Sequence, residues 1–163
     1  MSKANREKPH VYVIPEDKAE RQIAIGFEGH YSVINRQLQV MPVADGWRNV
    51  GKVFEKEYLP ILRRYEFAHV VMLIDFDGEG EHHRNELFEA VPSEYRNRVF
   101  VVGPSQEPED LKGATKQTYE QIGFALANDC DGNQTAMWGH EQLKHNDDQR
   151  KLLLEIVKPF LFK

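Results

Sequence analysis

Four short apolar segments alternate along this chain with longer segments of helical character, and this alternation restricts the folds open to it. The apolar segments are residues 10–17, 37–44, 68–77 and 98–105. The segments with helical spacing or helix start signals are residues 18–31, 48–66, 81–96 and 108–130. Strands that alternate with helices are typical of a parallel sheet covered by helices. We therefore predict an α/β fold, Rossmann-like, with a mostly parallel four-stranded sheet flanked by helices.

The length of 163 residues suits one domain with a hydrophobic core. Residues 1–9 are polar and are expected to form a disordered tail. Residues 10–163 are expected to form a single domain that ends in a helical C-terminal extension.

Charge and composition narrow the classes of partner. The chain carries 21 Lys and Arg against 26 Asp and Glu, a net charge of -5, so bulk positive charge cannot attract nucleic acid. The only cysteine, Cys130, forms no internal disulfide and is flanked by acids that oppose a thiolate. No apolar run approaches the roughly 20 residues of a membrane span. We expect a cytoplasmic protein that does not enter a membrane.

The third apolar segment runs directly into acidic residues at alternate positions. Asp75, Asp77 and Glu79 follow the apolar residues 70–74, with glycines at 78 and 80 that allow a tight turn. Two carboxylates at the end of one strand can reach a common Mg²⁺ ion, which prefers oxygen ligands. Solvated acids at a strand end are the simpler alternative.

The first segment ends in a second acidic pair, Glu16 and Asp17. Parallel strands present their carboxyl ends at one edge of the sheet, where α/β proteins bind ligands. Glu16 or Asp17 should therefore lie near Asp75 and Asp77, and the acid could bind metal or act in proton transfer.

This arrangement resembles the Toprim domain of topoisomerases, bacterial primases, recombination-mediator proteins and OLD-type nucleases. Those domains have a Glu after the first strand and D-x-D after the third, matched here by Glu16 in "VYVIPED" and by Asp75 and Asp77 in "LIDFDGE" over roughly residues 10–105. Asp17 stands where many Toprim domains have a Gly. The resemblance implies a free-standing Toprim protein, similar to OLD-type nucleases of which some act in defence. It implies Mg²⁺, or Mn²⁺, bound by Glu16, Asp75, Asp77 and Glu79, and phosphodiester hydrolysis of nucleic acid.

Two alternatives stay open. "LIDFDGEG" also resembles the D-x-D-G-T motif of haloacid-dehalogenase-type phosphatases, in which Asp75 would be the nucleophile. Glu79 at the Thr position and the long preceding segment count against that reading. A non-catalytic adaptor on the same scaffold is the second alternative, because a fold alone does not establish chemistry.

Candidate substrate contacts lie after the fourth apolar segment. Ser105 follows that segment, and Lys112 and Lys116 are one helical turn apart on the next predicted helix. A serine hydroxyl and lysine amines are suitable phosphate ligands. A protein partner or a homo-oligomer is compatible with the same scaffold.

Overall fold

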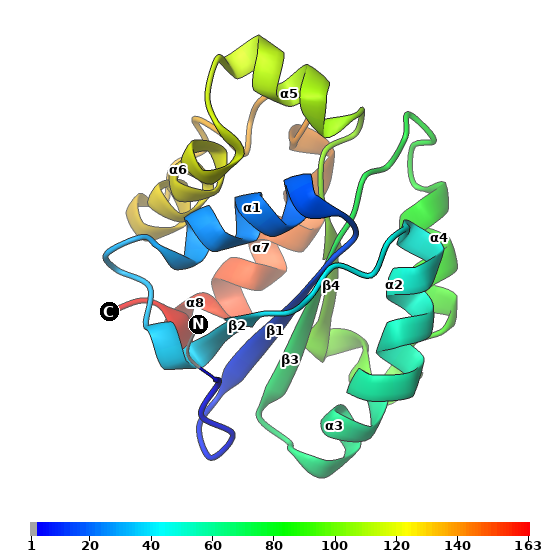
Figure 1. Cartoon of the computed structure of the whole chain (residues 1–163). Coiled ribbons are helices and arrows are strands. Elements are labelled where there is room, and N and C mark those ends of the chain that lie inside the picture. The colour runs from blue at the N-terminus through cyan, green and yellow to red at the C-terminus, as the bar shows by residue number, and fades with distance from the viewer. Residues whose placement is uncertain (1–2) are drawn as a thin grey trace.

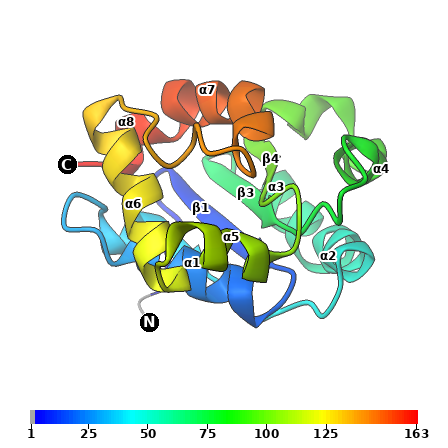
Figure 2. The same cartoon turned by 90° about the horizontal axis from the view of Figure 1, so that it is seen from above.

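The computed structural model describes residues 3–163 and contains one four-stranded sheet in which every strand is parallel to its neighbours. The strands are β1 (His10–Pro15), β2 (Leu38–Val40), β3 (Ala68–Leu73) and β4 (Val99–Val102), in the order β2-β1-β3-β4. Helices cover both faces of the sheet (Figures 1 and 2). The predicted α/β fold is confirmed.

Successive residues of the strands pack into different cores. Val11 and Val13 of β1 belong to the core under α1 (Lys18–Glu28), α6 (Tyr119–Gly132), α7 (Asp147–Ile156) and α8 (Lys158–Leu161). Tyr12 and Ile14 belong to the core on the opposite face, beneath α2 (Trp47–Val53), α3 (Leu59–Arg64) and α4 (His82–Glu89). Because side chains alternate along a strand, a sheet covered on both faces needs apolar residues at every position.

Two of the predicted helices are interrupted. Residues 48–66 form α2, a π-helical turn at Phe54–Tyr58, and α3, with Pro60 in the first turn of α3. Proline cannot donate the backbone hydrogen bond of a continuous helix, so the break at this site has a direct cause.

The single helix expected over residues 108–130 is instead two helices. α5 (Pro108–Thr115) ends at Lys116, which has φ 54°, and Thr118 starts α6 with a reciprocal capping box to Gln121. The prediction was wrong here because helical spacing continues across the break, whereas the cap is a local hydrogen-bonding signal.

Helices α1 and α6 touch backbone to backbone. A Cβ atom on Gly26 would lie 2.0 Å from the carbonyl oxygen of Glu120, and one on Gly123 would lie 1.8 Å from that of Ile23. Only glycine allows this approach. The contact fixes α1, which begins at the carboxyl end of β1, against the C-terminal half of the chain.

The C-terminal residues are integrated into the domain. Gln149 of α7 accepts a hydrogen bond from the backbone N–H of Val101 at 2.9 Å, which protects the exposed edge of β4. Residues 1 and 2 of the segment expected as a disordered tail lie outside the described residues. Within the rest of this segment Ala4 is buried and its N–H donates to Gln39 Oε1 at 3.1 Å, whereas Lys3 and residues 6–8 are exposed. No helix within residues 3–163 has the length and apolar character needed to cross a bilayer.

Candidate metal centre

Three carboxylates from different parts of the chain converge at the carboxyl edge of the sheet. Glu16, Glu20 and Asp75 each place an oxygen within 4.8 Å of the others. The loops that carry Glu16 and Asp75 follow β1 and β3, which are neighbours in the sheet (Figure 1). The expected meeting of the first and third strand ends is therefore present in the structure.

The backbone around Glu16 fixes which acid of the pair faces the cluster. Glu16 N–H donates to the carbonyl of Leu73 at 2.9 Å, and its own carbonyl accepts from Asp45 N–H at 2.8 Å. Asp17 is exposed and caps α1 by accepting from Lys18 N–H at 2.8 Å. Of the two acids left open by the sequence, Glu16 joins the cluster and Asp17 starts the helix.

Glu20 is the member that sequence reasoning missed. It lies in the first turn of α1 and is 1% exposed. Asp17 and Glu20 have the D-x-x-E spacing of a capping box, in which the glutamate would bind the N-cap amide. That spacing gives Glu20 a routine role in the sequence, whereas in the structure it faces Glu16 and Asp75.

The turn after β3 places Asp75 and Asp77 differently. Asp75 is buried and its Oδ1 accepts from Asp77 N–H at 2.8 Å. Phe76 between them is fully buried on the side of α4, with its ring 4.6 Å from the guanidinium carbon of Arg84. Asp77 has φ 52° and is exposed. It lies outside the converging trio, although its negative charge contributes to the raised pKa values of all three members.

Burial with few hydrogen-bond donors makes the charged state of the cluster costly. Oε1 of Glu16 and Oε2 of Glu20 are buried and accept no hydrogen bond from residues 3–163. Burial, followed by the charges of Glu20, Asp75 and Asp77, raises the pKa of Glu16 to about 8. Burial is also the main cause that raises the pKa of Glu20 to about 7 and the pKa of Asp75 to about 7. Near neutral pH these carboxyls hold protons that ordinary carboxyls release.

A small divalent cation fits these observations. Oxygen ligands around Mg²⁺ lie about 3 Å apart when adjacent and about 4 Å apart when opposite, and the three oxygens of this cluster all lie within 4.8 Å of one another. A cation would supply the missing partner to the two unpaired buried oxygens. It would also favour the charged form of each acid and so reverse the upward pKa shifts. The donor set of three carboxylates is suited to Mg²⁺ or Mn²⁺ and lacks the nitrogen and sulfur ligands typical of zinc.

The other residues expected at the site are not part of the cluster of three acids. Glu79 is exposed in the turn beyond Asp77 and is not one of the three converging acids. Ser105 lies beside this turn, since its carbonyl accepts from Gly78 N–H at 2.7 Å. Lys112 follows the acidic pocket on α5, with its amine 5.0 Å from the centre of the Tyr119 ring. Lys116 lines a separate groove along α6.

Six of the eight residues that line the pocket above the trio are acids. The pocket is lined by Glu16, Asp17, Ala19, Glu20, Asp75, Glu107, Pro108 and Glu109. No lysine or arginine contributes to this lining, so an anionic ligand would be repelled unless cations were bound first.

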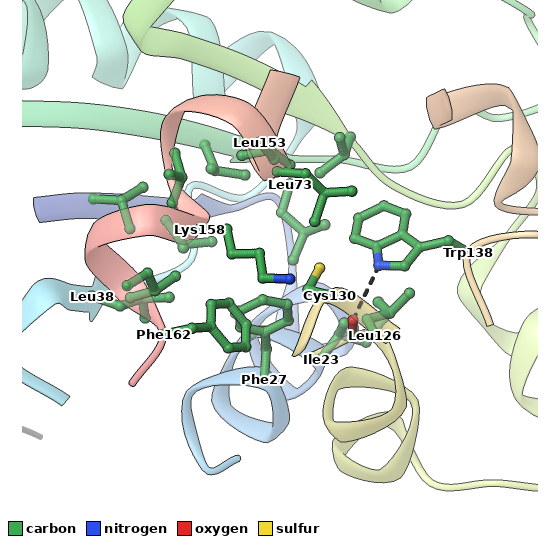
Figure 3. Close-up of a pocket in the computed structure, with 18 residues that line it drawn as sticks. Ile23, Phe27, Leu38, Leu73, Leu126, Cys130, Trp138, Leu153, Lys158 and Phe162 are labelled. Carbon is green, nitrogen blue, oxygen red and sulfur yellow. Dashed lines mark hydrogen bonds between the residues drawn. The ribbon is translucent and has the colours of Figure 1, made fainter. Parts of the chain in front are cut away.

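An apolar cavity of about 90 Å³ lies elsewhere, between the sheet, α1, α6 and the C-terminal helices (Figure 3). Cys130 lines it, and burial raises the pKa of this thiol to about 11. Trp138 also lines it and donates from Nε1 to the carbonyl of Leu126 at 3.1 Å. Because the thiolate is the nucleophilic form of cysteine, Cys130 is a core residue and not a catalytic one.

Comparison of the chain with protein-family models, curated proteins and solved structures gave no match. The family resemblance therefore rests on the residues of the sequence, and the case for a function rests on the geometry of the acidic cluster.

Proposed function

We propose that this protein is a Toprim-type, Mg²⁺- or Mn²⁺-dependent phosphodiesterase that hydrolyses nucleic acid. The observation that carries the proposal is the convergence of Glu16, Glu20 and Asp75, with two buried oxygens that lack a partner within residues 3–163. A cluster of acids in which two buried oxygens have no donor is unfavourable for folding alone, and such arrangements are concentrated at functional sites.

The three acids suit different tasks. Glu20 and Asp75 are the more deeply buried of the trio and are best placed to hold a cation. When bound, that cation would polarise the phosphate and neutralise the acidic pocket. Glu16 is the least buried of the three and lines the pocket, so it is the group best placed to give a proton to the leaving oxygen as the P–O bond breaks. The proton lost by the attacking water restores Glu16.

The test is a cleavage assay with labelled DNA and RNA in Mg²⁺, in Mn²⁺ and in EDTA, together with p-nitrophenyl phosphate. We expect metal-dependent cutting of a nucleic acid, reduced roughly 100-fold or more in Asp75→Asn and Glu20→Gln. Mutation of a residue that supports a metal ligand lowers activity by about 10- to 100-fold, and mutation of the ligand itself should lower activity at least as much. Glu155→Gln, an exposed acid on α7, is the matched control and should retain activity.

Calorimetry with Mn²⁺ gives an independent readout of the same site. Turnover of the small ester without cutting would favour the phosphatase that uses Asp75 as nucleophile. If the wild-type protein neither binds metal nor cuts nucleic acid, the proposal is refuted and the adaptor is favoured.

A further inference from the structure

A second concave surface lies along α6, outside the acidic pocket. This groove has a volume of about 540 Å³, within the range of roughly 300 to 1,000 Å³ usual for ligand sites. Its lining consists of Tyr31, Lys116, Gln117, Gln121, Phe124, Ala125 and Asn128. We call it the α6 groove.

Two aromatic rings of the α6 groove are open to solvent and held in place from below. Tyr31 is 69% exposed and Phe124 is 40% exposed. The buried ring of His30 stacks on Tyr31 at 4.2 Å between centroids and lies 4.6 Å from Phe124. Large exposed aromatic side chains on a rigid support are characteristic of stacking platforms.

Hydrogen bonds define the state of the supporting histidine. Ser32 N–H donates to His30 Nδ1 at 3.1 Å, so Nδ1 is an acceptor and Nε2 carries the proton. His30 Nε2 lies 3.3 Å from Asn128 Oδ1 and donates to it. The imidazole is therefore tied to the loop after α1 and to α6 at once, which orients the Tyr31 ring.

The polar part of the lining suits an anionic ligand with amine donors. Among the described residues, Lys116 is the only charged one that lines the groove, in a chain with a net charge of -5. Gln117 Oε1 is buried and accepts no hydrogen bond from the described residues. The exocyclic amine of a nucleobase is a donor of the required kind, and Lys116 can pair with the adjoining phosphate.

The groove fits a nucleic-acid strand better than a protein surface. Three of its seven lining residues are apolar, and the remaining four are amides or lysine. A stable interface between proteins buries about 800 Å² on each partner around an apolar centre. Base stacking requires only the exposed ring faces that are present.

Helix α6 links this groove to the acidic pocket. Glu109 of the pocket lies in the first turn of α5, and Lys112 of the same helix has its amine 5.0 Å from the centre of the ring of Tyr119, which is the first residue of α6. Phe124 is five residues further on, about 7.5 Å along the helix axis. A single strand of a few nucleotides is long enough to reach from one site to the other.

We propose that the α6 groove stacks unpaired bases on Tyr31 and Phe124 and so selects single-stranded nucleic acid as the substrate. Duplex DNA keeps its bases stacked inside the helix and cannot offer a base face to Tyr31. The inference rests on the proposed phosphodiesterase function for its biological meaning, but the binding itself requires neither metal nor cleavage.

The experiment measures binding of a fluorescent 12-nucleotide single strand by anisotropy, in EDTA, with the duplex form in parallel. We expect the single strand to bind more tightly than the duplex, and Tyr31→Ala and Phe124→Ala each to weaken binding about 5-fold or more, the range of one base–aromatic stack. Tyr31→Trp should retain affinity because the platform is preserved. Phe67→Ala, which removes a ring that is 45% exposed outside the groove, is the control and should bind as the wild type does.

Salt dependence tests the assigned phosphate contact. Lys116→Gln should reduce the slope of log affinity against log salt by about 0.7, the value for one phosphate of a single strand. Absence of single-strand binding by the wild type, preference for duplex, or equal affinity in Tyr31→Ala would overturn the inference.

A wild-type dimer that Tyr31→Ala converts to a monomer, measured by light scattering, would overturn it in favour of a second copy of the chain. If the protein binds the single strand in EDTA but cuts no nucleic acid in Mg²⁺, the phosphodiesterase function is rejected and the binding role of the groove is retained. If Tyr31→Ala cuts single strands and duplexes at the same rates as the wild type, the proposed role of the groove is rejected and the proposed phosphodiesterase function is retained.

Discussion

Two buried polar regions flank the turn after β3, and their hydrogen bonding is opposite. On one side Asn146 is fully buried and all of its amide groups are used. Its Oδ1 accepts from Arg84 Nη2 at 2.8 Å and from Gly103 N–H at 3.2 Å, and its Nδ2 donates to the carbonyls of Gly103 and Leu143, each at 2.9 Å. On the other side Glu16 and Glu20 each keep a buried oxygen without a partner.

The difference separates structure from function. A fully satisfied polar network holds elements in one arrangement, and here it joins α4, the end of β4 and the segment before α7. Arg84 completes it by donating from Nε to the carbonyl of Val101 at 3.0 Å and by pairing with Glu81. An unsatisfied acidic cluster weakens the fold and is understandable only if a ligand completes it.

Breaking the satisfied network should have the largest effect. Asn146→Ala removes the partner of Arg84 Nη2 and of the Gly103 N–H, and one of the bonds to the Gly103 carbonyl. Lost bonds to charged and neutral buried groups together predict a loss of about 3 to 4 kcal/mol in the free energy of unfolding. Urea denaturation measures it, with the exposed Asn85→Ala as the control. A loss below about 1 kcal/mol would mean that the network does not hold these elements.

Adding a cation to the unsatisfied cluster should have the next largest effect, and it should depend on pH. The pKa values of Glu16, Glu20 and Asp75 are raised to about 8, 7 and 7 from ordinary values of 4.5, 4.5 and 3.8. Between about pH 4 and pH 8 the folded protein therefore binds more protons than the unfolded chain, so the metal-free protein loses stability as pH rises. Metal competes with these protons and binds better at pH 8 than at pH 6.

Thermal unfolding with and without Mn²⁺ measures both effects. A concentration of 100 times Kd stabilises the fold by about 2.7 kcal/mol, roughly 5 to 10 °C in Tm for a chain of this size. The control is Glu20→Gln, in which the increase in Tm should be much smaller. An equal increase in the wild type and in this variant would place the metal elsewhere.

Removing one charge from the cluster should have the smallest effect, and it should be favourable in the absence of metal. In Glu20→Gln an uncharged amide replaces a carboxyl that is 1% exposed and that is unfavourable in its charged form. A shift of one pKa unit corresponds to about 1.4 kcal/mol, so we expect a gain of about 1 to 3 kcal/mol at pH 8 and none at pH 5, where Glu20 is protonated in the wild type. Urea denaturation at both pH values with EDTA tests this, with Glu155→Gln as the neutral reference. A loss of stability at pH 8 would show that Glu20 supports the fold.

The sequence determined the fold class and two members of the candidate site. The alternation of apolar strands with helices predicted the parallel sheet. Because the carboxyl ends of parallel strands lie at the same edge of a sheet, Glu16 and Asp75 were expected to converge. The same reasoning could not separate Asp77 from Asp75, because the turn that leaves Asp77 exposed depends on a local φ of 52°.

Only the tertiary structure decided the rest. Glu20 has the spacing of a helix cap, and Asn146 follows a segment without regular spacing, so neither carries a sequence signal for burial. Tyr31 meets Lys116 and Phe124 only because the close contact of α1 with α6 brings the loop after α1 beside α6. Local patterns report what a residue does for its own helix or strand, whereas burial and hydrogen-bond satisfaction depend on neighbours that are remote in the sequence.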